Sequence, residues 1–238
     1  IKGPRGQSIE KLEIYVPSAL DEEEQYAEHR TEYRFCGWRI KEQRFLIPNA
    51  PHLKSDESVI SELPYDCKGG EEKEAIKALD SLFNTTETQG PVLFAALLLP
   101  PLLDLLKLPR FGLFLSARAG TGKTDILKLF MCIYGSGWSS DELLSFAGTT
   151  DNAAIKKAES ARGLPFPIDN LRPQDGHIPL FRNITTAIME GKSKARLDRS
   201  GESKNQAEIS CLPIATGEDF PEGDAGLLGR WLVMEFMP

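Results

Sequence analysis

The stretch from residue 117 to residue 124 constrains the fold more than any other part of the chain. It reads Ala-Arg-Ala-Gly-Thr-Gly-Lys-Thr, directly after an apolar run at 111–115 and just before another at 126–131. A strand, a glycine-containing loop and a helix in this order are what a phosphate-binding P-loop requires. The competing interpretation is a glycine-lysine loop that joins a strand and a helix by chance.

The residue types in this stretch suit the phosphates of a nucleotide. Gly120 and Gly122 let backbone N–H groups approach phosphate oxygens closely, and the N-terminus of the following helix adds positive potential. Lys123 can reach the β- and γ-phosphates, and the Thr124 hydroxyl can bind Mg²⁺. One departure is Ala117, which stands where the P-loop pattern has its first glycine. We therefore expect ATP and Mg²⁺ as cofactors, bound by Ala119, Gly120, Thr121, Gly122, Lys123, Thr124 and Asp125.

A P-loop enzyme also needs an acidic residue at the end of a neighbouring strand. Asp169, after the apolar residues 164–168, is the candidate that would act on Mg²⁺ together with Thr124. The next residue, where many such ATPases have a glutamate that polarises water, is Asn170, which cannot accept a proton. Glu218 is a candidate to replace that glutamate. Alternatively, Asp169 and Asn170 merely form a turn.

Basic residues cluster between the strand predicted at 164–168 and the strand predicted at 209–215. We expect residues 194–197 to pair with 208–211 as a hairpin whose tip is 199–205. Clustered cations on such a hairpin can contact nucleic-acid phosphates, and the alternative is a solvated loop. The candidate nucleic-acid-binding residues are Lys192, Lys194, Arg196 and Arg199.

Bulk composition excludes several classes of protein. The net charge of −7 argues against non-specific coating of duplex DNA over the whole surface. The cysteines and histidines lack metal-site spacing, which indicates reduced thiols and no protein metal cluster. Residues 91–108 are strongly apolar, but Pro100, Pro101 and interrupting charges predict two short buried helices, with no membrane span. Without a secretory signal, a cytoplasmic location is expected.

The pattern along the chain predicts an α/β fold with three parts. Residues 1–65 form a small N-terminal module with β-rich stretches at 12–16, 33–38 and 44–47 and with an acidic loop or helix start at 21–24. Residues 71–108 are a helical segment that begins with an amphipathic helix at 71–83. From 109 to 238, alternating strands and helices predict a parallel sheet flanked by helices. The first residue is isoleucine and the last residues are strand-like, so we expect a fragment or a processed chain.

The order of these parts resembles the helicase-like ATPase domain of phage, plasmid and mobile-element replication proteins. That domain is related to the superfamily 3 helicases of the AAA+ class, within the AAA+/RecA-like P-loop NTPases. The resemblance covers roughly residues 33–238. It is carried by the P-loop and by residues 37–39, 45–48, 149–152, 169–170, 190–196, 216–218 and 230.

The resemblance implies a hexameric ring with ATP bound between subunits. Arg230 of one subunit would then face Lys123 of the next and act catalytically in trans, although an exposed arginine is also typical of an ordinary surface ion pair. The hairpin around Lys194 and Arg196 would point into the channel towards single-stranded DNA. A primase or another replication protein is a further expected partner.

Three functions are compatible with these residues. The first is an ATP-hydrolysing helicase or translocase, with Lys123, Asp169, Asn170, Glu218 and Arg230 as its catalytic set. The second is a nucleotide-gated assembly module with little turnover, which Asn170 favours. The third is a small-molecule or nucleotide kinase, which would need an arginine-rich lid over the phosphates.

Overall fold

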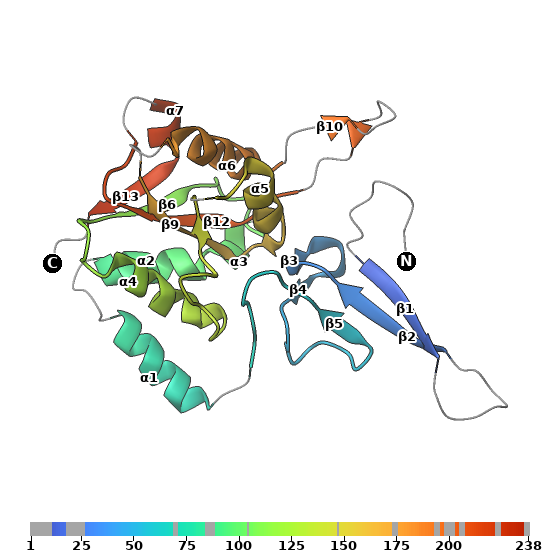
Figure 1. Ribbon diagram of the computed structural model, residues 1–238. Coiled ribbons are helices and arrows are strands. Elements are labelled where there is room, and N and C mark those ends of the chain that lie inside the picture. The colour runs from blue at the N-terminus through green and yellow to red at the C-terminus, as the bar shows by residue number, and fades with distance from the viewer. Residues whose placement is uncertain are drawn as a thin grey trace.

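The centre of the molecule is a parallel β-sheet. The computed structural model describes residues 11–17, 27–68, 71–83, 89–103, 105–146, 148–172, 176–192, 196–197, 203–204, 208–221 and 225–235. Within these, five strands pair in parallel in the order β13-β6-β12-β9-β7 (Figure 1). Their bounds are β6 Gly112–Ser116, β7 Leu144–Ser145, β9 Pro165–Leu171, β12 Leu212–Gly217 and β13 Trp231–Glu235. The predicted α/β architecture is confirmed.

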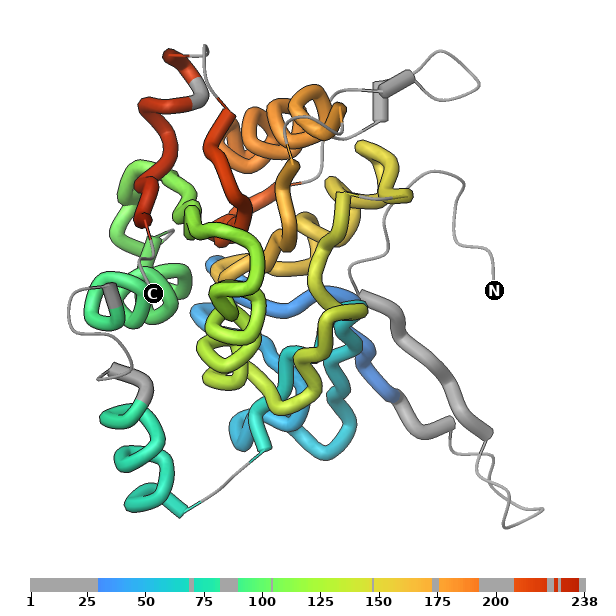
Figure 2. Tube along the Cα trace, turned by 60° about the vertical axis from the view of Figure 1, so that its left-hand side comes forward, coloured from blue at the N-terminus to red at the C-terminus, as the bar shows by residue number. Residues whose placement is uncertain are grey.

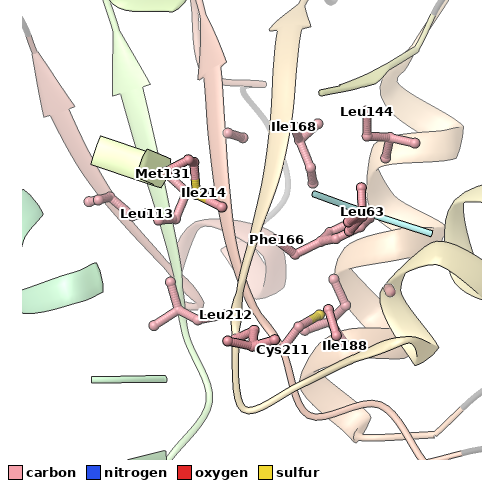
Figure 3. Packing of buried hydrophobic residues seen from close by; sticks show 14 of the residues in the cluster. Leu63, Leu113, Met131, Leu144, Phe166, Ile168, Ile188, Cys211, Leu212 and Ile214 are labelled. Atoms are coloured by element: carbon pink, nitrogen blue, oxygen red, sulfur yellow. The ribbon is translucent and has the colours of Figure 1, made fainter. Parts of the chain in front are cut away.

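Helices cover both faces of this sheet, which explains why its inner strands are continuous apolar runs. α5 and α6 lie on one face, and α4 and α2 lie on the other (Figure 1). Apolar side chains from the strands, such as Leu113, Phe166 and Ile214, meet those of the helices, such as Met131 and Ile188 (Figure 3). The helix bounds are α1 Glu72–Phe83, α2 Gln89–Leu98, α3 Pro100–Leu103, α4 Lys123–Met131, α5 Asp151–Glu159, α6 Ile178–Glu190 and α7 Ala225–Leu228, with 3₁₀ turns at Ile40–Glu42 and Cys132–Tyr134.

Several predicted strands have different limits in the structure. The strand predicted at 164–168 runs on to Leu171, and the strand predicted from Ile209 begins at Leu212. The β-rich stretch at 33–38 is two strands, because β2 ends at Tyr33 and β3 begins at Cys36. The predicted acidic loop at 21–24 lies outside the described residues.

The N-terminal part contains two small sheets. One has the order β1-β2-β5 and the other the order β4-β3-β8. The strands are β1 Lys11–Pro17, β2 Ala27–Tyr33, β3 Cys36–Arg39, β4 Arg44–Leu46, β5 Glu57–Val59 and β8 Ala161–Arg162. β8 comes from the segment between α5 and β9, so the second sheet joins the N-terminal part to the centre of the molecule.

Hydrogen bonds tie this N-terminal part to the parallel sheet. The Cys36 N–H donates to the Ser160 carbonyl at 2.9 Å, and the buried Tyr65 hydroxyl donates to the Pro165 carbonyl at 2.6 Å. Figure 2 shows the blue N-terminal trace lying against the core. Buried side chains of residues 33–65 belong to the same apolar cluster as the parallel sheet. These contacts cross the domain boundary that we predict after residue 65.

The helical segment is less buried than its sequence predicts. Two short helices, α2 and α3, form as expected, and Leu93, Leu97 and Leu103 are buried. The two helices are buried on one side only, because Leu98 and Leu102 are exposed. The helix predicted at 71–83 is also present as α1, but its small apolar residues are largely exposed. Among the described residues, no helix has the length and apolar character that crossing a membrane requires.

One partly buried ion pair in the N-terminal part has a predictable pH dependence. The Glu57 carboxylate accepts hydrogen bonds from the Arg44 guanidinium at 2.6 and 2.8 Å, from the Lys54 N–H at 3.0 Å and from the Tyr33 hydroxyl at 3.1 Å. Its side chain is 7% exposed. The hydrogen bonds, chiefly those from Arg44, lower the pKa of Glu57 from 4.5 to about 2.

Glu57→Gln will therefore lower the free energy of unfolding at pH 7 by roughly 2 kcal/mol. A carboxyl with a depressed pKa stabilises the fold above its unfolded pKa of 4.5 and loses that contribution as the pH falls towards about 2. The difference between wild type and variant should hence shrink from pH 4.5 downwards in urea titrations. Glu62→Gln is the control, because its pair with Lys156 is exposed and contributes little. A Glu57→Gln penalty independent of pH would contradict this account.

Candidate functional site

The carboxyl ends of the parallel strands meet at one edge of the central sheet, here called the carboxyl edge. The loop at 117–122 leaves β6 at this edge and leads into α4. Gly120 and Gly122 have φ values of 79° and 77°, and a Cβ at either position would meet nothing within 4 Å. Left-handed backbone, rather than crowding, therefore makes glycine favourable here. The backbone around Ala119 and Gly120 is exposed at the start of α4.

Ala117, the departure from the P-loop pattern, is a buried residue at the end of β6. Its N–H donates to the Gly217 carbonyl at 3.1 Å, which continues the pairing of β6 with β12. The side chain of Thr121 closes the loop by donating to the Arg118 carbonyl at 2.9 Å. Position 117 thus contributes to the sheet, whereas residues 118–122 form the exposed turn.

Lys123 is the first residue of α4 and is only 9% exposed. Its ammonium group donates to the Arg118 carbonyl at 3.2 Å, so the charge lies over the loop. Asp125, predicted to bind the nucleotide, lies in the first turn of α4. Its exposed carboxylate pairs with Lys128 at 2.7 Å along the same helix.

Three side chains from three elements meet at the carboxyl edge. The Asp169 carboxylate on β9 accepts a hydrogen bond from the Thr124 hydroxyl of α4 at 2.9 Å. The same oxygen, Oδ1, accepts one from the Thr216 hydroxyl of β12 at 2.6 Å. Thr216 is fully buried. The predicted proximity of Thr124 and Asp169 is thus seen in the structure, although they are 45 positions apart in the chain.

A β-bulge shapes this cluster. The pairing of β9 with β12 changes register between Ala215 and Gly217, where Asp169 and Asn170 together lie opposite Thr216. Asn170 has a φ of 58°, a left-handed conformation that asparagine tolerates better than most residues. Its N–H donates to the Thr216 hydroxyl at 3.0 Å. Bulges often occur beside active sites, where they redirect side chains.

The other predicted catalytic residues lie in two places. Glu218 follows β12 at the carboxyl edge, where its carbonyl accepts a hydrogen bond from the Ser116 hydroxyl at 2.7 Å. Arg230 lies at the opposite edge, because its carbonyl accepts the Gly112 N–H just where β13 and β6 begin. Arg230 is therefore separated from Lys123 by the length of β6 within one chain.

Two polar side chains at the carboxyl edge were not predicted. Ser116 anchors the residue after β12, and Arg172 donates to the Asn170 side chain at 3.1 Å. The sequence does contain a signal for Ser116, because it is a polar residue at the end of an apolar strand, directly before the loop. Arg172 had no comparable signal, because its contact depends on the conformation of the bulge.

The predicted basic hairpin exists, but its predicted register is wrong. β10 Arg196–Leu197 pairs with β11 Ser203–Lys204, and a bridge joins Lys192 to Glu208. Among the candidate nucleic-acid-binding residues, Lys192 is exposed and Arg196 is on β10. Lys194 and Arg199 lie outside the described residues.

Comparison with solved structures found similar chains. A solved structure titled "SCCmec type IV Cch - active helicase" is similar in fold, with a TM-score of 0.52 and 17% sequence identity over 79% of this chain. The chain spans about a third of that protein's length, as only 35% of it is covered. The apo C-terminal region of NrS-1 aligns over 75% of this chain and 42% of its own, with 14% identity and a TM-score of 0.39.

Family membership comes from sequence. A search of curated proteins found no significant match. The model of a domain of unknown function, DUF927, matches residues 6–208, which include the N-terminal sheets, the loop at 117–122 and Asp169. The chain therefore belongs to the DUF927 family.

Proposed function

We propose that this chain is an ATP-binding and ATP-hydrolysing AAA+ domain that acts on single-stranded DNA in the replication of a mobile element. The observation that carries the proposal is the hydrogen bond between Thr124 and Asp169. It lies beside the loop at 117–122, which leads into Lys123 at the start of α4. A hydroxyl at the start of a helix and a carboxylate on the adjacent strand are the pair that a P-loop enzyme uses for Mg²⁺. The fold shared with an active helicase supports the proposal.

The residues present fit Mg-ATP. Mg²⁺ at phosphates keeps several waters and needs one or two protein oxygens, which Thr124 and Asp169 can supply. Among the described residues, no group of three or more His, Cys, Asp or Glu forms a separate metal site. Bound Mg²⁺ would supply electrostatic stabilisation of the charge on the phosphates. The loop N–H groups and the Lys123 ammonium would hold and orient those phosphates.

Activation of water is the step in which this chain departs from the usual pattern. Asn170 cannot accept a proton, and its side chain accepts a hydrogen bond from Arg172. Glu218 is the nearest carboxylate along β12 and is half-buried at the carboxyl edge. We assign Glu218 as the group that polarises water. A nucleotide-gated module with little turnover is the alternative, which the asparagine favours.

The positions of Arg230 and the hairpin suit an oligomer, which we propose to be a hexamer. Arg230 is exposed at the edge opposite the loop, so it can serve the nucleotide only of another subunit. The hairpin that contains Arg196 projects from the sheet between α6 and β12 (Figure 1). We assign it to the DNA strand. A primase or another replication protein is a further proposed partner.

Phosphate release from ATP by the purified chain tests this proposal, with and without single-stranded DNA and with Mg²⁺ removed by a chelator as the control. Turnover that requires Mg²⁺ and rises with DNA is the expected result. Tight ATP binding without turnover would show that the chain is a nucleotide-gated module and not a helicase or translocase. Phosphoryl transfer to a small acceptor, with no effect of DNA, would overturn both in favour of a kinase.

Thr216→Val will separate positioning of Asp169 from phosphate binding. Valine matches threonine in shape, but it removes the donor to Asp169 and the acceptor for the Asn170 N–H. We expect turnover to fall about 10-fold and the Mg²⁺ concentration for half-maximal rate to rise, with ATP binding nearly unchanged. Thr216→Ser keeps the hydroxyl and should restore most of the rate. Equal rates for the valine and serine variants would show that the hydroxyl has no role.

A further inference from the structure

A basic pocket lies at the amino edge of the central sheet, opposite the carboxyl edge. Its lining includes Trp38, Arg39, Lys41, Arg162, Glu208 and Ser210, and its volume is about 430 Å³. Trp38 and Arg39 belong to β3, Arg162 belongs to β8, and the last two residues precede β12. The pairing of β3 with β8 thus brings residues from distant parts of the chain into one concave surface.

The charge of the basic pocket contrasts with that of the whole protein. Three cations and one carboxylate line it, whereas the chain has a net charge of −7. The Arg162 guanidinium stacks over the Phe35 ring at 4.4 Å, and Arg39 is held by Glu42 at 2.6 Å. Lys41 is exposed, and in the described part of the chain no ion pair involves it. Lys41 is thus the lining cation whose charge no described ion pair offsets.

An aromatic side chain adds a second kind of recognition. The half-buried Trp38 lines the basic pocket beside its cations, whereas Phe35 is only 3% exposed and lies under the Arg162 guanidinium. An aromatic surface next to arginine and lysine is the combination with which proteins bind single-stranded nucleic acids, by stacking on bases and pairing with phosphates. An acidic peptide would satisfy the cations but would offer no base to Trp38.

The basic pocket is continuous with the hairpin. Glu208 lines the pocket and also forms the bridge to Lys192 from which the hairpin extends. We propose that the basic pocket binds one nucleotide unit of a single-stranded nucleic acid whose adjoining phosphate lies towards Lys192. This inference rests on the proposed function, since it concerns the same strand. It adds β3 and the 3₁₀ turn at Ile40–Glu42 to the nucleic-acid-binding surface.

Lys41→Glu tests the basic pocket with a matched control, Lys77→Glu. Lys41 is suitable because Arg39 and Arg162 also make contacts within the fold. Lys77 is an exposed residue of α1, outside the pocket lining, and undergoes the same change of charge. The measurement is fluorescence anisotropy of a labelled 20-nucleotide single-stranded DNA at several salt concentrations. We expect Lys41→Glu to weaken binding about 10-fold and to reduce the salt slope by about 0.7, with Lys77→Glu within two-fold of wild type.

The outcomes distinguish this inference from the proposed function. If wild type binds DNA and Lys41→Glu binds it equally well, the proposed role of the basic pocket is refuted, while the proposed DNA-dependent function stands. An equal loss in both variants would reflect total charge and would also refute it. If wild type hydrolyses ATP but binds no single-stranded DNA, the proposed action on DNA fails together with the pocket. If labelled poly-glutamate binds and Lys41→Glu weakens that binding while DNA binding stays unchanged, the pocket is assigned to an acidic peptide and the inference is overturned.

Discussion

Replacing Lys123 with alanine will weaken ATP binding by about 100-fold and reduce turnover to background. Lys123 is 9% exposed, and its ammonium group donates a hydrogen bond to the Arg118 carbonyl. Alanine removes the cation that we propose to neutralise the β- and γ-phosphates, and it preserves the helix at the start of α4. Anisotropy of a fluorescent ATP analogue measures the first effect, and phosphate release measures the second.

Lys128→Ala is the matched control for this prediction. Lys128 is on the same helix, and its partner Asp125 is exposed, so losing the pair should change the free energy of unfolding by only a few tenths of a kcal/mol. ATP binding and turnover by Lys128→Ala should equal those of wild type. Retention of binding within three-fold by Lys123→Ala would mean that the loop at 117–122 does not hold phosphates.

The parallel sheet could be predicted because its strands have strong local signals. Continuous apolar runs such as the one at 111–115 alternate with helical patterns, which is typical of a parallel sheet with both faces covered. The meeting of Thr124 and Asp169 also follows, because the carboxyl ends of parallel strands share an edge. The bulge at Asn170 could not be predicted, since it exists only through the pairing of β9 with Thr216 on β12.

The hairpin shows why register is harder to predict than pairing. Its strands are short and polar, so no buried apolar face specifies which residues lie opposite one another. The structure pairs Leu197 with Ser203, whereas the sequence suggested a partner near Glu208. The burial of α2 and α3 was predicted only in part for a related reason, because Leu93 and Leu97 are buried but Leu98 and Leu102 are exposed. Apolar content predicts that a segment can be buried, but only the neighbouring elements determine which side chains they cover.

No local sequence pattern predicts the pairing of β3 with β8. Gly37 has a φ of 116°, and a Cβ there would lie 1.4 Å from the Arg162 carbonyl oxygen, so only glycine permits this approach. Gly37→Ala should lower the free energy of unfolding by roughly 3 kcal/mol or more, because backbone strain and a backbone clash act together. Urea unfolding followed by tryptophan fluorescence measures the loss, and limited proteolysis near residues 33–46 should show β3 released first.

Gly176→Ala separates the two causes of this loss. Gly176 also has a positive φ, 76°, but a Cβ there would meet nothing within 4 Å. Its replacement should therefore add backbone strain alone, about 1 kcal/mol. If Gly37→Ala lowers the free energy of unfolding more than Gly176→Ala does, the difference comes from the contact between β3 and β8. The basic pocket and the attachment of the N-terminal sheets both depend on that contact. Equal losses for the two variants would show that β3 can move away from β8 without harm, and the basic pocket would then not be a fixed feature of the fold.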